Sequence, residues 1–471
     1  MMNETHLIHH DADICIIGAG VAGAALACSL ANEKLKVIIV EKDWREQDRI
    51  VGELMQPDGV EQLKAMQLAH LLDGYDAQRI TGYTIMKDDT PLHIAYPEGK
   101  FGLGLTNGKF VQKMRDELTK GNNIKQIEAE AQTFIHEKGN RIAGIYCRNK
   151  DGQSIAIKAK LTIVMDGFFS TFRKQTTEVA ATVTGYFLGI VLKDCPLPFA
   201  EHGHVFLTES SPFLCYPITK NEIRFLIDFP GHQPPRKSEE LIQYLHQHVR
   251  SRIPESMHKA FDVCMQEGKF KVMPNHYLPG KPIMQDGVVV LGDALNMRHP
   301  LTGGGMTVTL RDVNSIQQLL KTLPIETTEE RMELIHAFYA SRTQNTAVNI
   351  LADALYKVMS NHDLKDACFN YLAEGGKQAQ EPIALLSGID KSKTTLAKHF
   401  FAVAAKGGMK KVNKNPGIAS MVDAYYMVGD AYAIIYPLLN NEVQNNTTKM
   451  WLRLGKNIFR KKQEIHNTHL I

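Results

Sequence analysis

The chain has 471 residues, and its 54 basic and 51 acidic residues give a net charge of +3. This length exceeds the usual size of one hydrophobic core, so we expect two or three domains. The nearly balanced charge argues against a protein that depends on neutralising nucleic-acid phosphates. The seven cysteines form no CxxC pair, which is typical of small core residues in a reducing compartment. Neither a signal peptide nor a membrane span of about 18 apolar residues is predicted.

A nucleotide-binding βαβ unit is predicted near the start of the chain. In order, it consists of a strand at 13–17, Gly18, Gly20 and Gly23, a helix at 24–30, a strand at 37–40, and Glu41. Gly18 permits a tight turn, Gly20 lets a pyrophosphate approach the backbone, and Gly23 allows close helix packing. Glu41 can accept hydrogen bonds from ribose hydroxyls. The glycines alone fit an ordinary turn, but the flanking elements and the acid favour a dinucleotide site.

A second motif follows an apolar strand at 161–165. Its Asp166-Gly167 turn, Ser170 and Arg173 can brace a loop beside a pyrophosphate through charge-assisted hydrogen bonds. Read alone, the same residues fit an ordinary strand-to-helix cap.

The segment 182–229 has β-rich pieces separated by turns, which predicts an antiparallel sheet inserted into the nucleotide unit. These pieces are 183–192, 204–207 and 223–229. His202 and His204 alternate on one predicted strand, but no third ligand stands at the usual spacing, so we predict no metal site.

The third motif is the most informative one. An apolar strand at 288–291 ends at Gly292-Asp293, and Gly303-Gly304-Gly305 open a helix. Asp293 can accept hydrogen bonds from a polyol, while the bare amides of the glycines can approach an anionic ring at a helix N-terminus. A flavin makes both contacts, so this stretch predicts a flavin site.

The remainder of the chain is predicted to be helical, at 332–349, 351–359 and 418–439. The last of these is apolar and aromatic but carries Asp423 and Asp430, which favours an interfacial or protein-packed helix over a membrane span. Residues 449–462 hold six basic residues and no acid. We interpret them as a basic amphipathic helix that attaches the protein to anionic lipid; a solvated terminal helix is the alternative.

In their order, the three motifs resemble those of the single-component flavoprotein monooxygenases, whose fold is typified by para-hydroxybenzoate hydroxylase. Three segments are more specifically similar to the squalene epoxidase (squalene monooxygenase) family: 49–57 (RIVGELMQP), 72–78 (LDGYDAQ) followed by Gly82-Tyr83, and 296–308 (NMRHPLTGGGMTV). The similarity continues through 348–352, 367–369 and 399–404 to about residue 443 and so covers most of the chain.

This resemblance implies an α/β fold with a Rossmann-type FAD-binding domain formed by 11–75, 101–175 and 280–330. A substrate domain with an antiparallel β-sheet would take 76–100 and 176–279, and a helical, membrane-associating C-terminal region 331–471. With the motif residues above, the FAD contacts would be Gly18, Gly20, Val21, Ala22, Gly23, Glu41, Lys42, Arg49, Leu54, Arg115, Glu130, Asp166, Asp293, Gly304, Gly305 and Met306. Residue type alone favours a solvated charged face for Arg49 and Arg115.

The family also implies two residues near the reaction, Tyr83 and Gln56, with a hydrogen bond between them. We interpret them as orienting the flavin edge and the substrate rather than acting as acid and base. As a bare residue, a tyrosine after a glycine in a β-like run is more often part of a core.

The implied reaction is epoxidation of squalene to 2,3-oxidosqualene with O2. Electrons would come from NADPH through a separate reductase, because the FAD takes the one complete dinucleotide motif. The implied location is the cytoplasmic face of a membrane, the endoplasmic reticulum in a eukaryote. An apolar substrate calls for an apolar tunnel, for which Phe206, Leu207, Phe213, Leu214 and Tyr216 are candidates, with ordinary core packing as their alternative.

Two other functions remain open at this stage. One is a related flavoenzyme, such as a hydroxylase or prenyl reductase, acting on another isoprenoid or aromatic substrate. The other is a lipid-binding protein of the same fold without catalytic activity, which would bind no flavin.

Overall fold

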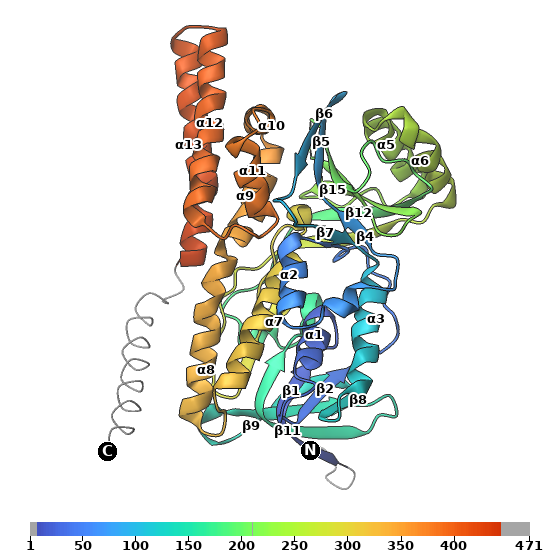
Figure 1. Ribbon diagram of the computed structural model, residues 1–471, viewed down its shortest axis with the longest axis vertical. Coiled ribbons are helices and arrows are strands. Elements are labelled where there is room, and N and C mark those ends of the chain that lie inside the picture. The colour runs from blue at the N-terminus through green and yellow to red at the C-terminus, as the bar shows by residue number, and fades with distance from the viewer. Residues whose placement is uncertain (1–6, 210, 444–471) are drawn as a thin grey trace.

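A seven-stranded sheet with a parallel centre forms the lower part of the molecule in the computed structural model, which describes residues 7–209 and 211–443 (Figure 1). Its order is β8-β2-β1-β11-β10-β9, and β17 also pairs with β11. The parallel strands are β1 (Ile8–Ile17), β2 (Val37–Glu41), β8 (Ile124–Glu128), β11 (Ser154–Val164) and β17 (Val288–Val290). β10 (Ile142–Arg148) and β9 (Glu130–His136) continue the sheet antiparallel.

The predicted strands of the nucleotide unit are confirmed. Residues 14–17 of β1 and 37–40 of β2 are all buried, as expected where helices cover both faces of a parallel sheet. The covering helices are α1 (Val21–Ser29), α3 (Asn107–Glu117), α7 (Gly305–Thr322) and α8 (Thr328–Ser341). α1 and α7 both start at glycine-containing loops beside the carboxyl ends of the parallel strands.

A second sheet lies above the first in Figure 1, with the order β16-β12-β15-β14-β13-β5-β6. Its strands are β5 (Gly82–Lys87), β6 (Thr90–Ala95), β12 (Thr182–Lys193), β13 (His202–Leu207), β14 (Phe213–Pro217), β15 (Glu222–Pro230) and β16 (Lys271–Tyr277). All pairings are antiparallel except β5 with β13. The expected antiparallel sheet is therefore present. Its helices α5 (Ser238–His248) and α6 (Glu255–Glu267) were not predicted.

A small third sheet and two short helices join these layers. The sheet contains β3 (Leu54–Met55), β7 (Gly102–Gly104) and β4 (Gln78–Ile80). The helices are α2 (Pro57–Ala65), which packs against α7, and α4 (Arg173–Thr176).

The last part of the chain is helical, as predicted, and its helices are α9 (Thr346–Ser360), α10 (His362–Ala373), α11 (Lys377–Leu386), α12 (Lys393–Lys414) and α13 (Ile418–Val443). One expectation is wrong: residues 332–349 do not form a single helix, because a 3-10 turn at Arg342–Asn345 separates α8 from α9. The turn brings two side chains to one buried carboxylate. Arg342 Nε lies 3.0 Å and Asn345 Nδ2 2.7 Å from oxygens of Asp312. The predicted basic helix at 449–462 lies outside the described residues.

Candidate active site

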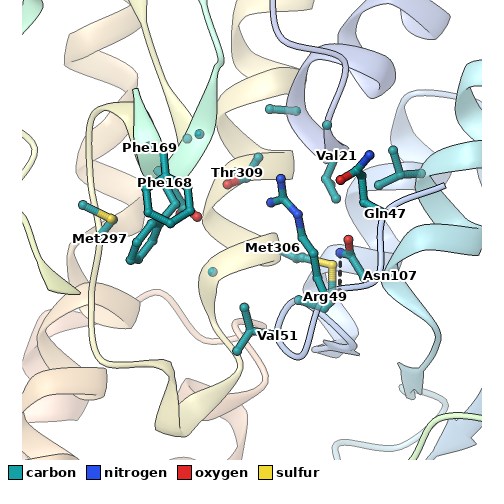
Figure 2. Close-up of a pocket in the computed structure, with 18 of the residues that line it drawn as sticks. Val21, Gln47, Arg49, Val51, Asn107, Phe168, Phe169, Met297, Met306 and Thr309 are labelled. Atoms are coloured by element: carbon teal, nitrogen blue, oxygen red, sulfur yellow. Dashed lines mark hydrogen bonds between the residues drawn. The ribbon is translucent and has the colours of Figure 1, made fainter. Parts of the chain in front are cut away.

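A cavity of about 410 Å³ opens at the carboxyl ends of the parallel strands, between the two large sheets. Fourteen of the predicted FAD contacts line it: Gly18, Gly20, Val21, Ala22, Glu41, Lys42, Arg49, Leu54, Arg115, Glu130, Asp166, Asp293, Gly305 and Met306. Figure 2 shows Val21, Gln47 and Asn107 on one side and Phe168 and Met297 on the other. We call this the first cavity. Its lining runs from Ile17 to Thr309, so segments from distant parts of the sequence meet at one site.

The glycines of the first motif divide into packing positions and an open position. Gly18 has φ +95°, a left-handed conformation that favours glycine. A Cβ on Gly23 would lie 1.8 Å from the carbonyl oxygen of Gly18, so Gly23 permits close packing and does not line the cavity. At Gly20, by contrast, a Cβ would meet no atom of the described chain within 4 Å. The backbone there is bare and faces free space.

Glu41 and Arg115 hold the glycine loop in place through its backbone. Glu41 Oε2 accepts from the Ala19 amide at 2.8 Å, and Arg115 Nε donates to the Ala19 carbonyl at 2.8 Å. Arg115 is only 4% exposed, so the alternative of a solvated charged face is wrong for it. Arg49 is exposed, but its side chain projects into the cavity in Figure 2.

The second and third motifs are joined by Arg173. Its guanidinium donates to the carbonyl of Phe168 at 2.7 Å and to that of Asp293 at 3.2 Å. Asp166 Oδ2 accepts from the Thr171 amide at 2.9 Å. Burial raises the pKa of Asp166 and of Asp293; Arg298 is the main positive charge that opposes this at Asp293. Both motifs thus form one continuous wall of the cavity.

Polar groups in this wall fit a flavin dinucleotide. Oδ1 of Asp166 is buried and has no hydrogen-bond partner within residues 7–209 and 211–443, a state that costs free energy until a ligand donor pairs with it. The N-terminus of the 18-residue helix α7 also faces the cavity at Gly305, where a Cβ would meet no described atom within 4 Å. Gly304 instead sits behind this surface, because its Cβ would contact Val348.

A second cavity, of about 150 Å³, adjoins the first, and its lining includes Tyr83 and Leu301, which line the first cavity as well. Almost all its other lining side chains are apolar, including Ile85, Val205, Leu355, Val358, Met359, Leu364, Leu386, Phe400 and Val403. Most of them come from α9 to α12. The two cavities therefore place an apolar compartment beside the dinucleotide site.

The expectation that the sheet lines an apolar tunnel is only partly confirmed. Leu207 lines the second cavity, and Leu214 and Tyr216 line the first. Phe206 and Phe213 instead pack in a core with residues of α5 and α6. Sequence reasoning missed the helical lining, whose signal was the apolar face of α9.

Gln56, Tyr83 and Tyr96 form a buried hydrogen-bonded group at the boundary of the two cavities. The hydrogen bond expected between Gln56 and Tyr83 is present, with Nε2 donating to the Tyr83 hydroxyl at 2.8 Å. Nε2 also donates to the Thr302 carbonyl at 2.7 Å, and the Tyr96 hydroxyl donates to Gln56 Oε1 at 2.5 Å. Burial raises the pKa of Tyr83 to about 12, so this phenol stays protonated at neutral pH. Tyr96 was not predicted.

The two histidines considered as metal ligands have other partners. His202 Nδ1 lies 3.0 Å from Thr84 Oγ1, and His204 Nδ1 lies 3.1 Å from the carbonyl oxygen of His202. Burial lowers the pKa of each imidazole to about 4, so both are neutral. In the part of the chain that the structure describes, no three His, Cys, Asp or Glu side chains gather as metal ligands.

Comparison with known proteins gives concordant matches. A squalene epoxidase family model matches residues 158–425, and an NAD(P)-binding Rossmann-like model matches residues 16–45. The mitochondrial squalene epoxidase 2 of Arabidopsis thaliana is 40% identical, over 91% of this chain and 76% of that protein. Squalene monooxygenase SE1 of Panax ginseng is 38% identical, over 91% and 82%. PqsL, a probable FAD-dependent monooxygenase from Pseudomonas aeruginosa, superposes with a TM-score of 0.64 at 19% identity, over 77% of this chain and 100% of that one.

The Rossmann-type sheet, the dinucleotide cavity and the second sheet above it define a flavoprotein of the FAD-dependent monooxygenase fold. Within that class, the extent and identity of the sequence matches determine the family. The chain belongs to the squalene epoxidase family.

Proposed function

We propose that this protein is an FAD-dependent monooxygenase that epoxidises squalene to (S)-2,3-oxidosqualene with O2 and electrons from NADPH. The observation that carries the proposal is an apolar cavity sharing Tyr83 and Leu301 with the dinucleotide cavity. Bound FAD would supply the redox chemistry that activates dioxygen for transfer of one oxygen atom to an alkene.

The chain itself would bind and orient squalene and shield it from water. Squalene has no polar group for the protein to hold, so its position must come from the shape of an apolar site. The second cavity offers such a site, and its lining keeps water away from the reacting alkene. An alkene must lie within about 3.5 Å of the oxygen it receives. Tyr83 and Leu301 stand where that alkene would pass into the first cavity.

Within the first cavity, we assign the adenosine and pyrophosphate to the side formed by Gly20, Val21, Glu41 and Arg115. The ribityl chain and the ring would lie toward Asp293 and the N-terminus of α7, with Met306 beside the ring. The remaining predicted contacts, Ala22, Lys42, Arg49, Leu54, Glu130, Asp166 and Gly305, line the same cavity and support this direction.

A product assay tests the proposed function. The purified full chain would be incubated with FAD, NADPH, a flavoprotein reductase, O2 and squalene in detergent. Gain of one oxygen atom at the terminal alkene, seen by mass spectrometry, is the expected result. A yellow, reducible protein that releases only hydrogen peroxide would point to another isoprenoid substrate, and a chain that takes up no FAD would point to the lipid-binding alternative.

Filling the second cavity should block the substrate but not the cofactor. Leu355 on α9 lines this cavity and is only partly buried, so Leu355→Trp can extend into the free space. We expect the KM for squalene to rise about tenfold or more, since about 1.4 kcal/mol of lost binding is a factor of ten. Kinetics with FAD content measured on the same samples checks this.

Leu319→Trp is the matched control, because Leu319 is partly buried on α7 and lines neither cavity. An equal KM change in both variants would argue against the second cavity as the substrate site.

We also propose that the protein attaches to a membrane surface, through which so apolar a substrate arrives. The hairpin of α12 and α13 projects beyond the other helices in Figure 1. Eight large apolar or aromatic side chains are exposed on it: Met409, Ile418, Met421, Val422, Tyr425, Val428, Tyr432 and Tyr436. Lys410 and Lys414 are exposed near its tip. No helix in the described part of the chain is long and apolar enough to cross a membrane.

Polar substitutions on this hairpin should weaken membrane binding without affecting the site. Replacing Met421, Tyr432 and Tyr436 by serine removes exposed apolar area, and we expect at least about a tenfold loss of partitioning. Sedimentation with anionic lipid vesicles measures it. Val263→Ser, on the exposed side of α6, is the control. Unchanged partitioning of the triple variant would contradict the proposed surface.

The proposed function also includes a separate reductase that delivers the electrons.

A further inference from the structure

Asn275 on β16 belongs to the second sheet, yet it lines the first cavity. It is 1% exposed, and its Oδ1 is buried without a hydrogen-bond partner in the part of the chain that the structure describes. A buried amide oxygen usually accepts a hydrogen bond, and one that lacks a donor costs free energy. An unpaired acceptor in the wall of a ligand cavity therefore indicates a donor on the ligand.

The other end of this amide is fixed by Asp228. Nδ2 donates to Oδ1 of this buried carboxylate at 3.2 Å, and Ser211 Oγ donates to its Oδ2 at 2.6 Å. The Tyr356 hydroxyl hydrogen-bonds the same carboxylate. An ionised carboxylate only accepts, so the amide presents its nitrogen to it and not its oxygen. Asp228 thus determines which amide atom is left for a ligand.

His299 could give Oδ1 a donor only if the amide turned over. Its Nδ1 accepts from the Leu301 amide at 3.3 Å, so the neutral ring carries its proton on Nε2, which lies 3.3 Å from Asn275 Nδ2 and 3.7 Å from Asp228 Oδ1. The turned amide would accept this proton, but its oxygen would then face the carboxylate in place of the nitrogen. Because a charge-assisted hydrogen bond is about twice as strong as a neutral one, the amide keeps its nitrogen toward Asp228.

Asn275 lies at the end of the first cavity to which the ring of FAD is assigned. It is next to His299, and Pro300 and Leu301, which follow His299, line that cavity. The same loop leads to Gly305 at the start of α7. Squalene has no N–H or O–H group, so the donor for Oδ1 must belong to the cofactor. The oxidised flavin ring carries an N–H group at N3, and reduction adds another at N5.

We propose that Asn275 is a further cofactor-binding residue, whose Oδ1 accepts a hydrogen bond from an N–H group of the flavin ring. The second sheet then holds the ring as well as covering it, and Asp228 is a positioning residue that acts through the amide. This inference rests on the FAD site of the proposed function but does not depend on squalene as the substrate.

The test compares Asn275→Leu with Ser211→Ala in the full chain. Each removes one buried donor from Asp228, but Ser211 lines neither cavity, so only Asn275→Leu removes an acceptor from the cofactor site. If N3–H is the donor, we expect the affinity for oxidised FAD to fall about fivefold in Asn275→Leu, with a shift of the flavin absorption bands. Ser211→Ala should bind FAD like the wild type. Fluorescence and absorption titrations measure both.

The reduction potential distinguishes the two N–H groups. If N5–H is the donor, the affinity for oxidised FAD stays unchanged in Asn275→Leu. The midpoint potential of bound FAD then falls by about 20 mV, which is a fivefold weaker binding of the reduced form at about 30 mV per factor of ten. Unchanged affinity and potential, or equal changes in Ser211→Ala, would overturn the inference. Weaker binding with an unchanged spectrum would assign the donor to a ribityl hydroxyl and overturn it as well.

Nuclear magnetic resonance of the wild-type chain loaded with ring-labelled 15N-FAD tests the same contact without a variant. We expect an N–H signal that exchanges slowly with solvent, at N3 or, after reduction, at N5. Exchange of both groups at the rate of free FAD would overturn the inference. Neither experiment measures epoxide, so a chain that binds FAD but forms no epoxide would contradict the proposed function alone.

Discussion

A valine at position 20 is expected to give a folded chain that does not retain FAD. The backbone of Gly20 has φ −75°, which any residue adopts, and a Cβ there meets free space in the apoprotein. The two methyl groups of valine would occupy the cavity where a pyrophosphate approaches the backbone. We expect FAD affinity to fall by up to about 100-fold, since overpacking of a filled site costs about 1–3 kcal/mol.

Alanine at Gly23 provides the contrast within the same motif. Its Cβ would lie 1.8 Å from the Gly18 carbonyl oxygen, so α1 cannot keep its place and little folded protein is expected. FAD titration by fluorescence and far-UV circular dichroism separate the two outcomes. A Gly20→Val chain that binds FAD normally would show that the cofactor does not approach this backbone.

Removal of Asp58 is expected to destabilise the whole chain. Its carboxylate accepts from Arg311 Nε at 2.6 Å, and the Arg311 side chain is fully buried. Asp58→Ala leaves a buried guanidinium without its counter-charge, which costs about 3–5 kcal/mol. Urea unfolding of the FAD-loaded protein measures the loss.

Two further variants test whether the unpaired charge of Arg311 causes this destabilisation. Glu61→Ala on the same helix breaks the exposed pair with Lys64 and should cost less than about 1 kcal/mol. Asp58→Leu combined with Arg311→Met removes both charges, and we expect it to recover most of the stability. A double variant as unstable as Asp58→Ala would show that lost packing, not the unpaired charge, causes the destabilisation.

The local motifs of the cofactor site could be read from the sequence because each depends on adjacent residues. A strand, a bare glycine loop and a following helix are encoded within a short segment, and the carboxyl ends of parallel strands necessarily meet at one edge. Asp166 and Asp293 therefore came together as expected. Arg115 was recognisable only through family resemblance, since a lone arginine on a helix does not reveal its burial.

Features built from distant segments could not be predicted in the same way. The second cavity depends on how α9 to α12 pack, and periodicity identifies an apolar face without identifying what it contacts. Tyr96 lies 40 residues from Gln56, to whose amide oxygen it donates, and directly after β6, where it resembles an ordinary core aromatic. The 3-10 turn at Arg342–Asn345 likewise depends on Asp312, a residue on another helix. The domain bounds stay a prediction.

The order of strands in the first sheet also sets when during synthesis this protein becomes able to hold its cofactor. Val288 to Val290 of β17 pair with Thr162 to Val164 of β11, after the whole second sheet has been made. The wall carrying Asp293 and the start of α7 reaches the site only then, so a nascent chain ending before Thr309 lacks part of the cavity lining. Such long-range pairing is slow to form. FAD capture therefore reports that β17 has joined the first sheet, before the helices from α8 onward are complete.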